Sequence, residues 1–378
     1  MASYPKRRWK MPVPLFRLSK VFPNHGLINP IAVWMKSSMP AEGRSDKRQT
    51  KKPAKFLEIC NVDMLTDTHV SLSLEAQQWA STIRHWQNEI CQALEAEDGQ
   101  AAFRSDTWER PAGGGGITRI MENGKVFEKG GVNTSAVYGE LPESLRQLMQ
   151  TPHRYLFAAG LSLVIHPLNP YVPTVHANWR YFELYDADGN VADCWIGGGS
   201  DLTPYYLFEE DARHFHLTLK QAMDPFGKDL YPMFKQECDT YFRNAHRDGE
   251  ARGIGGVFYD YIRPADTRAN LSLEQLFAFQ QAGKEAFLAA YLPIVQRRKH
   301  MPYGEKEQYW QEIRRGRYVE FNLIHDRGTL FGLKTGGRTE SILMSLPPRA
   351  RWVYQYQPEP GSPEAVLLEV CQHPRQWV

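Results

Sequence analysis

The feature that most constrains the fold is a succession of strand-like stretches joined by short turns. Residues 160–166, 174–185 and 191–196 are predicted as strands, and the five residues between the last two, Asp186-Ala187-Asp188-Gly189-Asn190, have the composition of a turn. Further strands are predicted at 117–121, 125–128, 254–262, 318–326, about 329–334 and near 351–356. Strands joined by short turns run antiparallel, because parallel neighbours need a long crossover. This order favours an α+β fold over a doubly wound parallel one.

Helical periodicity occurs in blocks between these strands. From Leu72 to Leu94, apolar residues recur at every third or fourth position, and Gly99 follows where a helix should end. Further helices are predicted at about 208–222, 231–248, 272–298, 304–315 and 338–345. They are numerous enough to cover both sides of one sheet. Since no internal repeat and no linker-like stretch occurs after residue 70, we expect a single folded domain.

Glycine-rich segments do not form a nucleotide-binding motif. The run at 113–116 lacks the GKS or GKT ending of a phosphate loop, so we expect a flexible loop before the 117–121 strand, which forms a hairpin around Asn123-Gly124. The five cysteines contain no CxxC pair, which argues against a zinc ribbon or an iron–sulfur cluster and suggests a reducing compartment. No apolar run is long enough for a transmembrane segment.

Basic charge is concentrated at the N-terminus. Residues 1–55 contain 13 Lys and Arg but two acids, whereas the whole chain has a net charge of only +2. We therefore expect no nucleic-acid partner. Residues 1–63 are predicted as a basic, disordered extension, a targeting segment or an upstream extension of a chain that starts at Met64. Residues 64–378 are predicted to form the folded domain.

Three predicted strands have one polar face each, because side chains alternate along a strand. These faces hold Thr174, His176, Asn178 and Arg180; Ser162 and His166; and Tyr318, Glu320, Asn322 and Asp326. An antiparallel sheet with one solvated face would show a similar pattern. His, Asn, Arg and Asp are less typical of a wet face than Lys, Glu and Thr, so a buried polar site is favoured.

Several arginines are suited to binding carboxylates. Arg180, Arg327 and Arg338 offer planar forks for this purpose, although each alone could be a surface salt-bridge partner. Gly336 and Gly337 precede Arg338 and would let backbone amides approach an anion. The residues therefore predict a polar, anion-binding pocket but no reaction.

Long blocks of the sequence resemble the oxygen-dependent coproporphyrinogen III oxidases. The blocks are GGGGITRIMENGKVFEKGGVNTSAVYG (113–139), SLVIHPLNPYVPTVHANWRYFE (162–183), WIGGGSDLTPYYLFEEDARHFH (195–216), RGIGGVFYDY (252–261) and GRYVEFNLIHDRGTLFGLKTGGRTESILMSLPPRARW (316–352). The resemblance extends from about residue 72 to Val378. It implies an enzyme of heme and porphyrin biosynthesis that decarboxylates two propionates of coproporphyrinogen III to vinyl groups. Dioxygen is the oxidant, no organic cofactor takes part, and the products are protoporphyrinogen IX, carbon dioxide and hydrogen peroxide.

The resemblance also implies roles for individual residues. His176 corresponds to a proton donor, and Asp326, Arg180 and Asp201 correspond to other catalytic positions. The implied substrate-binding residues are Ser162, Asn178, Trp179, Arg180, Arg327, Gly336, Gly337 and Arg338. The implied architecture is a three-layer α-β-α domain, in which helices cover both faces of a large flat antiparallel sheet. A homodimer with an interface including Tyr318 to Val353 is implied too. The expected location is cytoplasmic, or an organelle if residues 1–63 are a targeting segment.

Four histidines match positions assigned to a divalent metal in some bacterial members: His166, His176, His216 and His246. Their placement on separate strands and helices lacks the local spacing of a motif such as HExxH, so structural or acid–base roles are an alternative. Two other classes stay open. A metal-dependent hydrolase would need these histidines to converge on one ion, and a non-catalytic tetrapyrrole-binding protein would not need His176 and Asp326 together.

Overall fold

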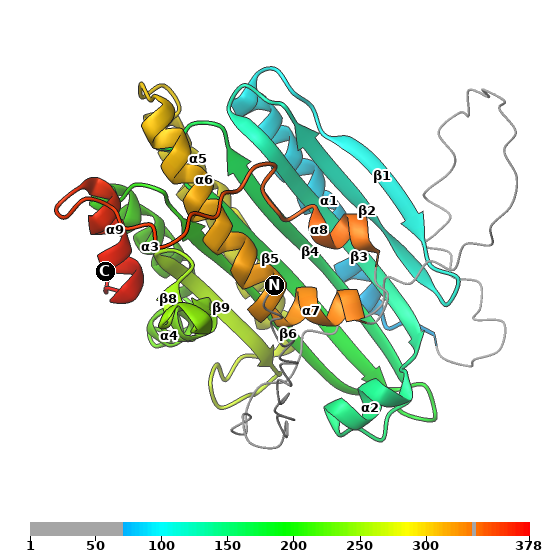
Figure 1. The fold of residues 1–378 in the computed structure, drawn as a ribbon. Helices are drawn as coiled ribbons and strands as arrows, with labels where there is room; N and C mark the ends of the chain where they lie inside the picture. Colours follow the sequence, from blue (N-terminus) through cyan, green and yellow to red (C-terminus); the bar gives the residue numbers. More distant parts are fainter. Residues whose placement is uncertain (1–70, 335–337) are drawn as a thin grey trace, which may run out of the picture.

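A seven-stranded antiparallel sheet forms the centre of the computed structural model, which describes residues 71–334 and 338–378 (Figure 1). The strand order is β1-β2-β3-β4-β5-β6-β9, and each neighbouring pair is antiparallel. The strands are β1 (Arg104–Glu109), β2 (Gly114–Glu122), β3 (Phe127–Glu140), β4 (Tyr155–Pro167), β5 (Thr174–Tyr185), β6 (Val191–Thr203) and β9 (Gly255–Ile262). Two short strands, β7 (Arg243–Asn244) and β8 (Glu250–Ala251), form a separate ribbon.

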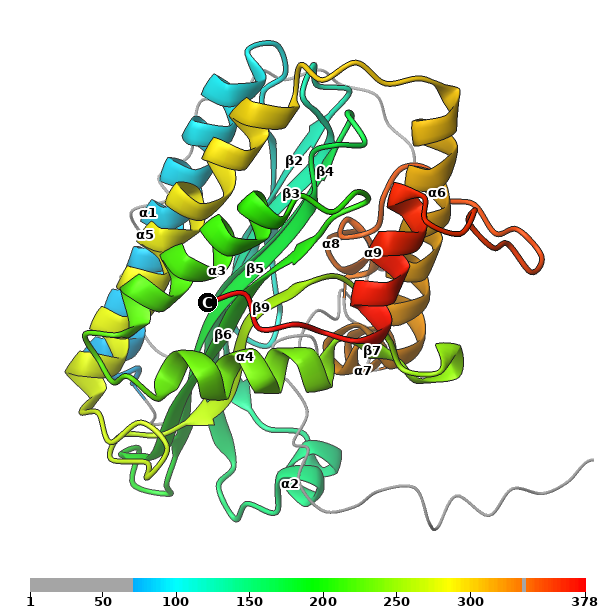
Figure 2. The same ribbon diagram turned by 90° about the vertical axis from the view of Figure 1, so that its left-hand side faces the viewer.

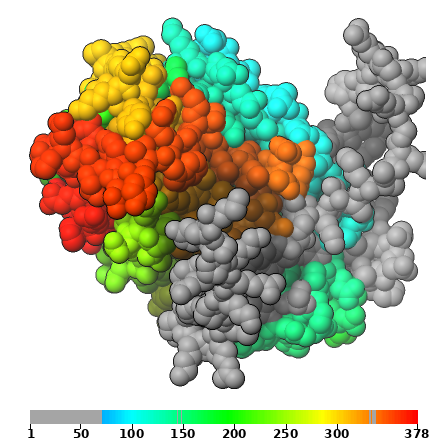
Figure 3. All heavy atoms as spheres, viewed as in Figure 1, coloured from blue at the N-terminus to red at the C-terminus, as the bar shows by residue number. Residues whose placement is uncertain are grey.

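Helices cover both faces of this sheet (Figure 2). One face carries α1 (Leu74–Asp98), α3 (Glu209–Met223) and α5 (Leu273–Arg298). The other carries α6 (Glu305–Glu320), α7 (Arg327–Lys334), α8 (Thr339–Leu343) and α9 (Pro363–Gln372), whose orange-to-red atoms cover much of the front in Figure 3. The short helix α2 (Glu143–Met149) follows β3, and α4 (Leu230–Tyr241) packs against β9 at the sheet edge. The predicted three-layer α+β architecture is confirmed.

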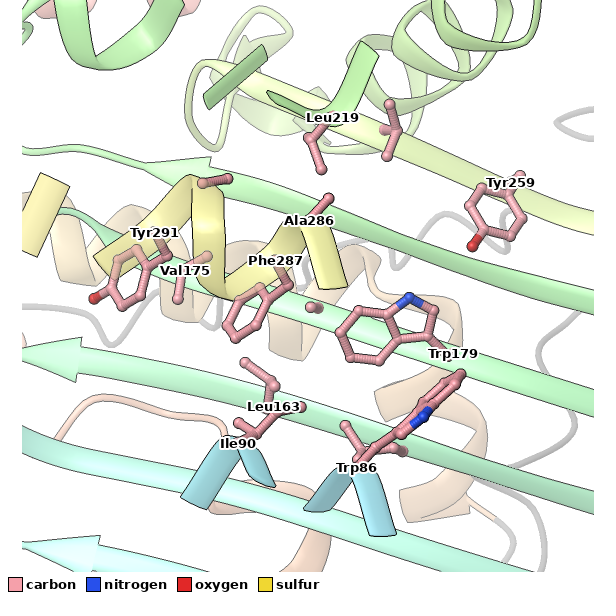
Figure 4. Close-up of a cluster of buried hydrophobic side chains, with 14 of the residues drawn as sticks. Trp86, Ile90, Leu163, Val175, Trp179, Leu219, Tyr259, Ala286, Phe287 and Tyr291 are labelled. Carbon is pink, nitrogen blue, oxygen red and sulfur yellow. The ribbon is translucent and has the colours of Figure 1, made fainter. Parts of the chain in front are cut away.

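Helix α1 shows how the sequence determines the hydrophobic layer. The Ser73 side chain accepts a hydrogen bond from the Ala76 N–H at its N-terminus, and Gly99 adopts a left-handed φ of 73° at its end. Trp79 and Trp86 lie on its buried face with their rings in edge contact, 5.3 Å apart. Figure 4 shows Trp179 of β5 beside both Trp86 of α1 and Phe287 of α5. The predicted apolar stripe of α1 is therefore core packing.

The prediction of strands at 318–326 and 329–334 is wrong. Helix α6 continues to Glu320, a five-residue π-helical segment (Phe321–His325) follows, and 327–334 form α7. Tyr318, Val319 and Phe321 are all buried, so this helix has no single apolar stripe. A buried helical segment rich in aromatic and β-branched residues cannot be distinguished from a strand by periodicity. No strand occurs near 351–356 either, where the chain is irregular.

Other differences are smaller. Residues 114–116 belong to β2 rather than to a flexible loop. The β2–β3 connection comprises residues 123–126 and is longer than a two-residue hairpin turn, and the Asp98 carboxylate accepts hydrogen bonds from the backbone N–H groups of residues 125–127. Helix α4 ends at Tyr241, so the predicted 231–248 helix is too long, and β1 and α9 were not predicted. Among the residues that the structure describes, no helix combines the length and hydropathy needed to cross a membrane.

Candidate active site

A cavity lies between the sheet and the helices on its second face. It encloses about 1070 Å³ of space between atoms, including its open mouth. We call the strand residues that line it the floor: Asn133, Ser135, Gly160, Leu161, Ser162, Val164, His176, Asn178, Arg180, Phe258 and Asp260. We call the residues that line it from α4, the π-helical segment, α7 and the α8 region the roof: Tyr241, Asn322, Asp326, Arg327, Gly328, Thr329, Ser341, Ile342, Met344 and Ser345. Phe242 and Arg252 line it between the two.

Strand register brings the predicted floor residues together. Ser162 of β4 pairs with Asn178 of β5, and His176 of β5 pairs with Asp201 of β6. Since alternate residues share a face, Ser162, His176 and Asn178 all line the cavity, together with Arg180. Trp179 points to the opposite face, where its side chain is 2% exposed in the hydrophobic core (Figure 4). The structure therefore does not bring the Trp179 side chain to the cavity.

His176 is held by a buried chain of charged groups. Its Nδ1 lies 2.8 Å from Asp201 Oδ1, and Arg252 donates to both Asp201 oxygens at 2.8 and 2.7 Å. Burial alone would raise the pKa of Asp201, but the Arg252 charge and the hydrogen bond from His176 outweigh it and lower that pKa. An ionised Asp201 acts as acceptor for the N–H at Nδ1, and Nε2 of His176, the nitrogen left for proton transfer, lies 3.3 Å from the Asn178 side-chain nitrogen.

Arg180 has hydrogen-bonding capacity that the protein leaves unused. Its Nη1 donates to the Asn178 side-chain oxygen at 2.5 Å, whereas Nε and Nη2 are buried and form no hydrogen bond. Nη2 lies 3.2 Å from Asp260 Oδ1 in an ion pair. Unsatisfied buried donors are uncommon in folded proteins and often mark a place where a ligand binds. Arg180 is thus a suitable partner for an anion.

The roof carries a carboxylate into the same cavity. Tyr241 donates its hydroxyl to Asp326 Oδ1 at 2.8 Å, and Asp326 Oδ2 accepts from the backbone N–H of Thr329 at 2.7 Å, in the first turn of α7. The guanidinium of Arg327 lies over the Tyr241 ring, 4.6 Å from its centre. Burial raises the pKa of Tyr241, so its hydroxyl stays protonated and donates. Asp326 and Arg327 therefore line the cavity as predicted, although they come from helical segments.

A second cluster anchors the roof below the π-helical segment. The Glu320 carboxylate accepts from Arg247, from Trp352 Nε1 at 2.9 Å and from Arg317 at 3.1 Å. His246 Nε2 lies 2.8 Å from Glu320 Oε2, and its Nδ1 lies 2.6 Å from His325 Nε2. Burial would raise the pKa of Glu320, but hydrogen bonds from Arg247 and His246 lower it to about 2. Glu320 was predicted to share a face with Asp326, but it does not line the cavity.

Arg338 lies next to the cavity rather than in its lining. It forms an ion pair with Asp106 of β1 and donates to the Ser341 hydroxyl at 2.9 Å. Ser341 itself lines the cavity and accepts at its backbone oxygen from Asn133 at 2.9 Å. The predicted residues Gly336 and Gly337 lie outside the described part of the chain.

The four predicted metal ligands do not converge. His166 is hydrogen-bonded to Thr174 and to the Ser345 carbonyl oxygen, and His216 to Tyr231 and the Ile254 carbonyl oxygen. His176 faces Asp201 and His246 faces Glu320, as described above. Within residues 71–334 and 338–378, no group of three or more His, Cys, Asp or Glu side chains is arranged to hold a metal ion. The arrangement of the described residues therefore does not support a metal site shared by these four histidines.

Several cavity residues were not predicted from the sequence. Arg252 and Asp260 lie in the block 252–261, and Asp260 stands among apolar and aromatic residues of β9 without an alternating pattern, so its only signal is a charged residue within an apolar strand. Asn133 and Ser135 are two residues apart on β3, beyond the end of the strand predicted there. Tyr241 gave no signal of its own, because the last residue of a helix is not distinguished by periodicity.

Comparison with known proteins gives the family. The profile of the coproporphyrinogen III oxidase family matches residues 78–377. The chain is 47% identical over 340 residues to the "Oxygen-dependent coproporphyrinogen-III oxidase, chloroplastic" of Glycine max, which covers 87% of this chain and 85% of the relative. It is also 47% identical over 340 residues to "Coproporphyrinogen-III oxidase 1, chloroplastic" of Arabidopsis thaliana, covering 87% and 86%. A match of this extent, which includes every described cavity residue, shows that the chain belongs to the coproporphyrinogen III oxidase family.

Proposed function

We propose that this cavity carries out the oxidative decarboxylation of two propionates of coproporphyrinogen III to vinyl groups. The observation that supports this most is the pairing of opposite charges across one cavity: Arg180 in the floor has buried donors without hydrogen bonds, and Asp326 in the roof presents a carboxylate. A porphyrinogen carries propionates at its rim and pyrrole N–H groups at its centre. A site for this ring needs cations to bind the propionates and a hydrogen-bond acceptor for the pyrrole N–H groups.

In each step a propionate loses carbon dioxide and two electrons, and dioxygen accepts them. The side chain –CH₂CH₂COO⁻ together with O₂ and one proton becomes –CH=CH₂, CO₂ and H₂O₂, so the protein must supply a proton. His176 is suited to this role in its doubly protonated form, because the ionised Asp201 accepts from Nδ1 and stabilises the imidazolium, which can then give up its other proton. Dioxygen is the substrate implied by the name of the Glycine max relative, and we propose no organic cofactor.

Arg180 binds a propionate in this proposal, and Ser162 and Asn178 complete its surroundings in the floor. Asp326 accepts from the pyrrole N–H groups and stabilises positive charge that develops on the electron-rich ring. Arg327 lies beside it in the roof and offers a second cation for the rim of the ring. Arg338 acts on the substrate through Ser341, to which it donates a hydrogen bond.

The proposal is tested by mixing the purified protein with coproporphyrinogen III without oxygen and then admitting oxygen while product masses are followed. We expect no reaction before oxygen and two successive losses of the mass of a carboxyl group and one hydrogen after it. Binding without turnover in the presence of oxygen would instead identify a tetrapyrrole carrier. Activity that disappears with a chelator and returns only with a stoichiometric metal would overturn our proposal that no metal is required.

We also infer a homodimer whose interface includes Tyr318 to Val353. The large apolar side chains Leu323, Ile324, Leu333 and Trp352 in this stretch are exposed, and so is Tyr354 just beyond it. Such a concentration of exposed apolar residues is typical of an interaction surface. Sedimentation of Ile324→Asp should show a shift towards the monomer, whereas Leu217→Asp, at an exposed position on α3, should leave the assembly unchanged.

The compartment is a separate proposal. We propose a cytoplasmic location, with an organelle as the alternative if residues 1–63 are a targeting segment. The names of the two plant relatives place those proteins in the chloroplast, which supports the alternative. Expressing residues 1–378 and residues 64–378 as fluorescent fusions in the source cells would decide between them, because only a targeting segment makes the two fusions differ in location.

A further inference from the structure

Asp260 places a carboxylate of the protein against the arginine that would bind the substrate. It lies near the end of β9, lines the cavity, and its Oδ1 is 3.2 Å from Arg180 Nη2. The side chains of Asp260 and Arg180 are only 11% and 5% exposed. The charge of Arg180 is therefore already balanced before any anion enters, and none of the roles proposed above uses this carboxylate.

The backbone around this pair is irregular. The pairing of β6 with β9 shifts register between Ile196 and Gly198, because Asp260 and Tyr261 of β9 both lie opposite the single residue Gly197, which is a bulge in β9. A Cβ atom at Gly197 would lie 2.5 Å from Asp260 Oδ1 and 2.6 Å from Arg180 Nη2, so only glycine leaves room for the pair. The next residue after Asp260, Tyr261, has a left-handed φ of 55°. Such conformations cost free energy and are concentrated at functional sites.

The contact between Asp260 and Arg180 is incomplete. Nε and Nη2 of Arg180 form no hydrogen bond, so Asp260 balances the charge without occupying the donors. The neighbouring pair of Arg252 and Asp201 differs, because two hydrogen bonds of 2.8 and 2.7 Å join its members. Both bonds come from Arg252 Nη2, and hydrogen bonds between two charged groups are stronger than neutral ones. An entering carboxylate can thus accept hydrogen bonds from Arg180 that Asp260 does not accept.

We propose that Asp260 is a resident counter-ion that competes with a substrate propionate for Arg180 and thereby sets which rim group the site retains. This inference rests on the proposed role of Arg180 as a propionate ligand. With a propionate bound, Arg180 faces two carboxylates, and their repulsion weakens binding. Once that propionate has become a vinyl group, Asp260 alone balances Arg180, so no unpaired buried cation is left. The vinyl group then leaves easily, and the next propionate can take its place.

The test is the binding of coproporphyrin III, the stable oxidised ring with the same propionates, measured by fluorescence titration. Asp260→Asn removes the charge but retains an oxygen for the Tyr261 N–H, which donates to Asp260 Oδ1 at 3.1 Å. We expect about tenfold tighter binding, because one like charge is removed beside the ligand. Turnover should show a fall in KM together with a fall in kcat, because the bound propionate is stabilised more than the transition state, in which the carboxylate charge is being lost. If Asp260 has only a structural role, the substitution should weaken binding of the ring instead of tightening it. Unchanged or weaker binding by folded Asp260→Asn therefore overturns the inference.

Two controls separate this inference from the proposed function. Asp193→Asn removes a carboxylate that pairs with Arg263 outside the cavity lining, so it should leave binding unchanged. Arg180→Lys keeps the charge but loses the planar fork, and it should weaken binding. If Arg180→Lys binds as the wild type does, the role of Arg180 in the proposed function fails. If it weakens binding but Asp260→Asn does not tighten it, only the role of Asp260 fails.

The double variant and a smaller substitution complete the test. In Arg180→Lys/Asp260→Asn the tightening should be much smaller than in Asp260→Asn alone, since the effect acts through the Arg180 fork. Full tightening in the double variant would contradict this. Should Asp260→Asn fail to fold, Asp260→Ser removes the same charge with a small polar side chain, and the same sign of the binding change is expected.

Discussion

The floor and the roof of the cavity hold their functional groups in different ways. In the floor, His176, Asn178 and Arg180 stand on one central strand whose register with both neighbours fixes their positions. In the roof, Asp326 and Arg327 follow a π-helical segment at a junction between two helices. Floor residues are paired side chain to side chain within a buried sheet, whereas Asp326 is held by Tyr241 and by one backbone N–H.

This difference suggests a division of labour. A sheet with antiparallel neighbours on both sides changes shape little, so the floor is suited to proton transfer and anion binding that require fixed distances. Helical segments that are joined by a short non-helical stretch can shift relative to the sheet. The roof is therefore suited to adjusting to a porphyrinogen ring that enters the cavity and turns between the two decarboxylations. Variants of each half can show whether rigidity and adjustment are in fact separated in this way.

The largest effect is expected in the floor. His176→Ala removes the proposed proton donor, and general acid–base catalysis typically contributes about a hundredfold to ten-thousandfold in rate. We expect kcat to fall within that range while circular dichroism shows the fold to be retained. His214→Ala is the matched control, because His214 lies on α3, where its ring is hydrogen-bonded to the Ala289 carbonyl oxygen outside the cavity lining. Near-normal turnover of His176→Ala would remove this residue from the chemistry.

In the roof, Asp326→Asn removes the charge of the carboxylate but keeps a side chain that can still form its structural contacts. An asparagine oxygen can still accept from the Thr329 N–H or from Tyr241, so the first turn of α7 stays bonded. Loss of one preorganised charged group typically costs on the order of a hundredfold in rate, which is the loss in kcat that we expect. Asp326→Ala loses these contacts as well and should also lower stability. A fully active Asp326→Asn would show that the roof contributes shape rather than charge.

A smaller effect concerns stability in acid. The pKa of Glu320 is lowered to about 2 from an ordinary 4.5, so its stabilising contribution is complete above pH 4.5 and is lost as the pH falls towards 2. Glu320→Gln should cost about 1–2 kcal/mol at pH 7, since its partners keep weaker hydrogen bonds. Glu320→Gln should also make the free energy of unfolding, measured by urea titration, less dependent on pH between pH 7 and about 3.5.

Hydrogen exchange of the wild type shows which part of the molecule loses stability in acid. We expect amides of residues 321–334 to lose protection in acid before those of β4 and β5, because Glu320 anchors the roof and not the floor. Equal loss of protection in both would mean that floor and roof open as one cooperative unit, which contradicts the division described above.

The smallest effect is expected from residues 1–63, which contribute to neither half in this interpretation. Deleting them should leave kcat and KM unchanged and lower the free energy of unfolding by less than about 1 kcal/mol, the size of a typical single lesion. Thermal unfolding of both forms in the same buffer provides the measurement. A larger loss would show that the segment packs against the folded domain.

The floor could be predicted from the sequence because its residues alternate with a period of two. Side chains two apart on a strand share a face, so the alternation alone places His176, Asn178 and Arg180 together, and all three line the cavity. Their partners were not predictable, because Asp201–Arg252 and Arg180–Asp260 depend on how β5, β6 and β9 are aligned. Register between strands is a tertiary property that one sequence does not show.

The roof residues were identified correctly despite a wrong secondary structure. Asn322 and Asp326 are four residues apart, a spacing that shares a face both on a strand and on a helix. Both line the cavity, so the error left their placement unaffected. Glu320, six residues before Asp326, shares a face with it only on a strand, and in the structure it binds His246 and Arg247 instead. The prediction failed where the two periodicities differ.

The π-helical segment also takes up one residue that a regular helix would not need. An α turn completes a circle with 3.6 residues, and a π turn takes up about one residue more than an α turn does. Deleting a single residue from 321–325 would therefore restore a regular helix and leave the direction of the chain that follows nearly unchanged. The Asp326 carboxylate would then stay near the cavity, although the chain before it is one residue shorter. In this part of the chain, the loss of one residue is tolerated better than the loss of the Asp326 charge.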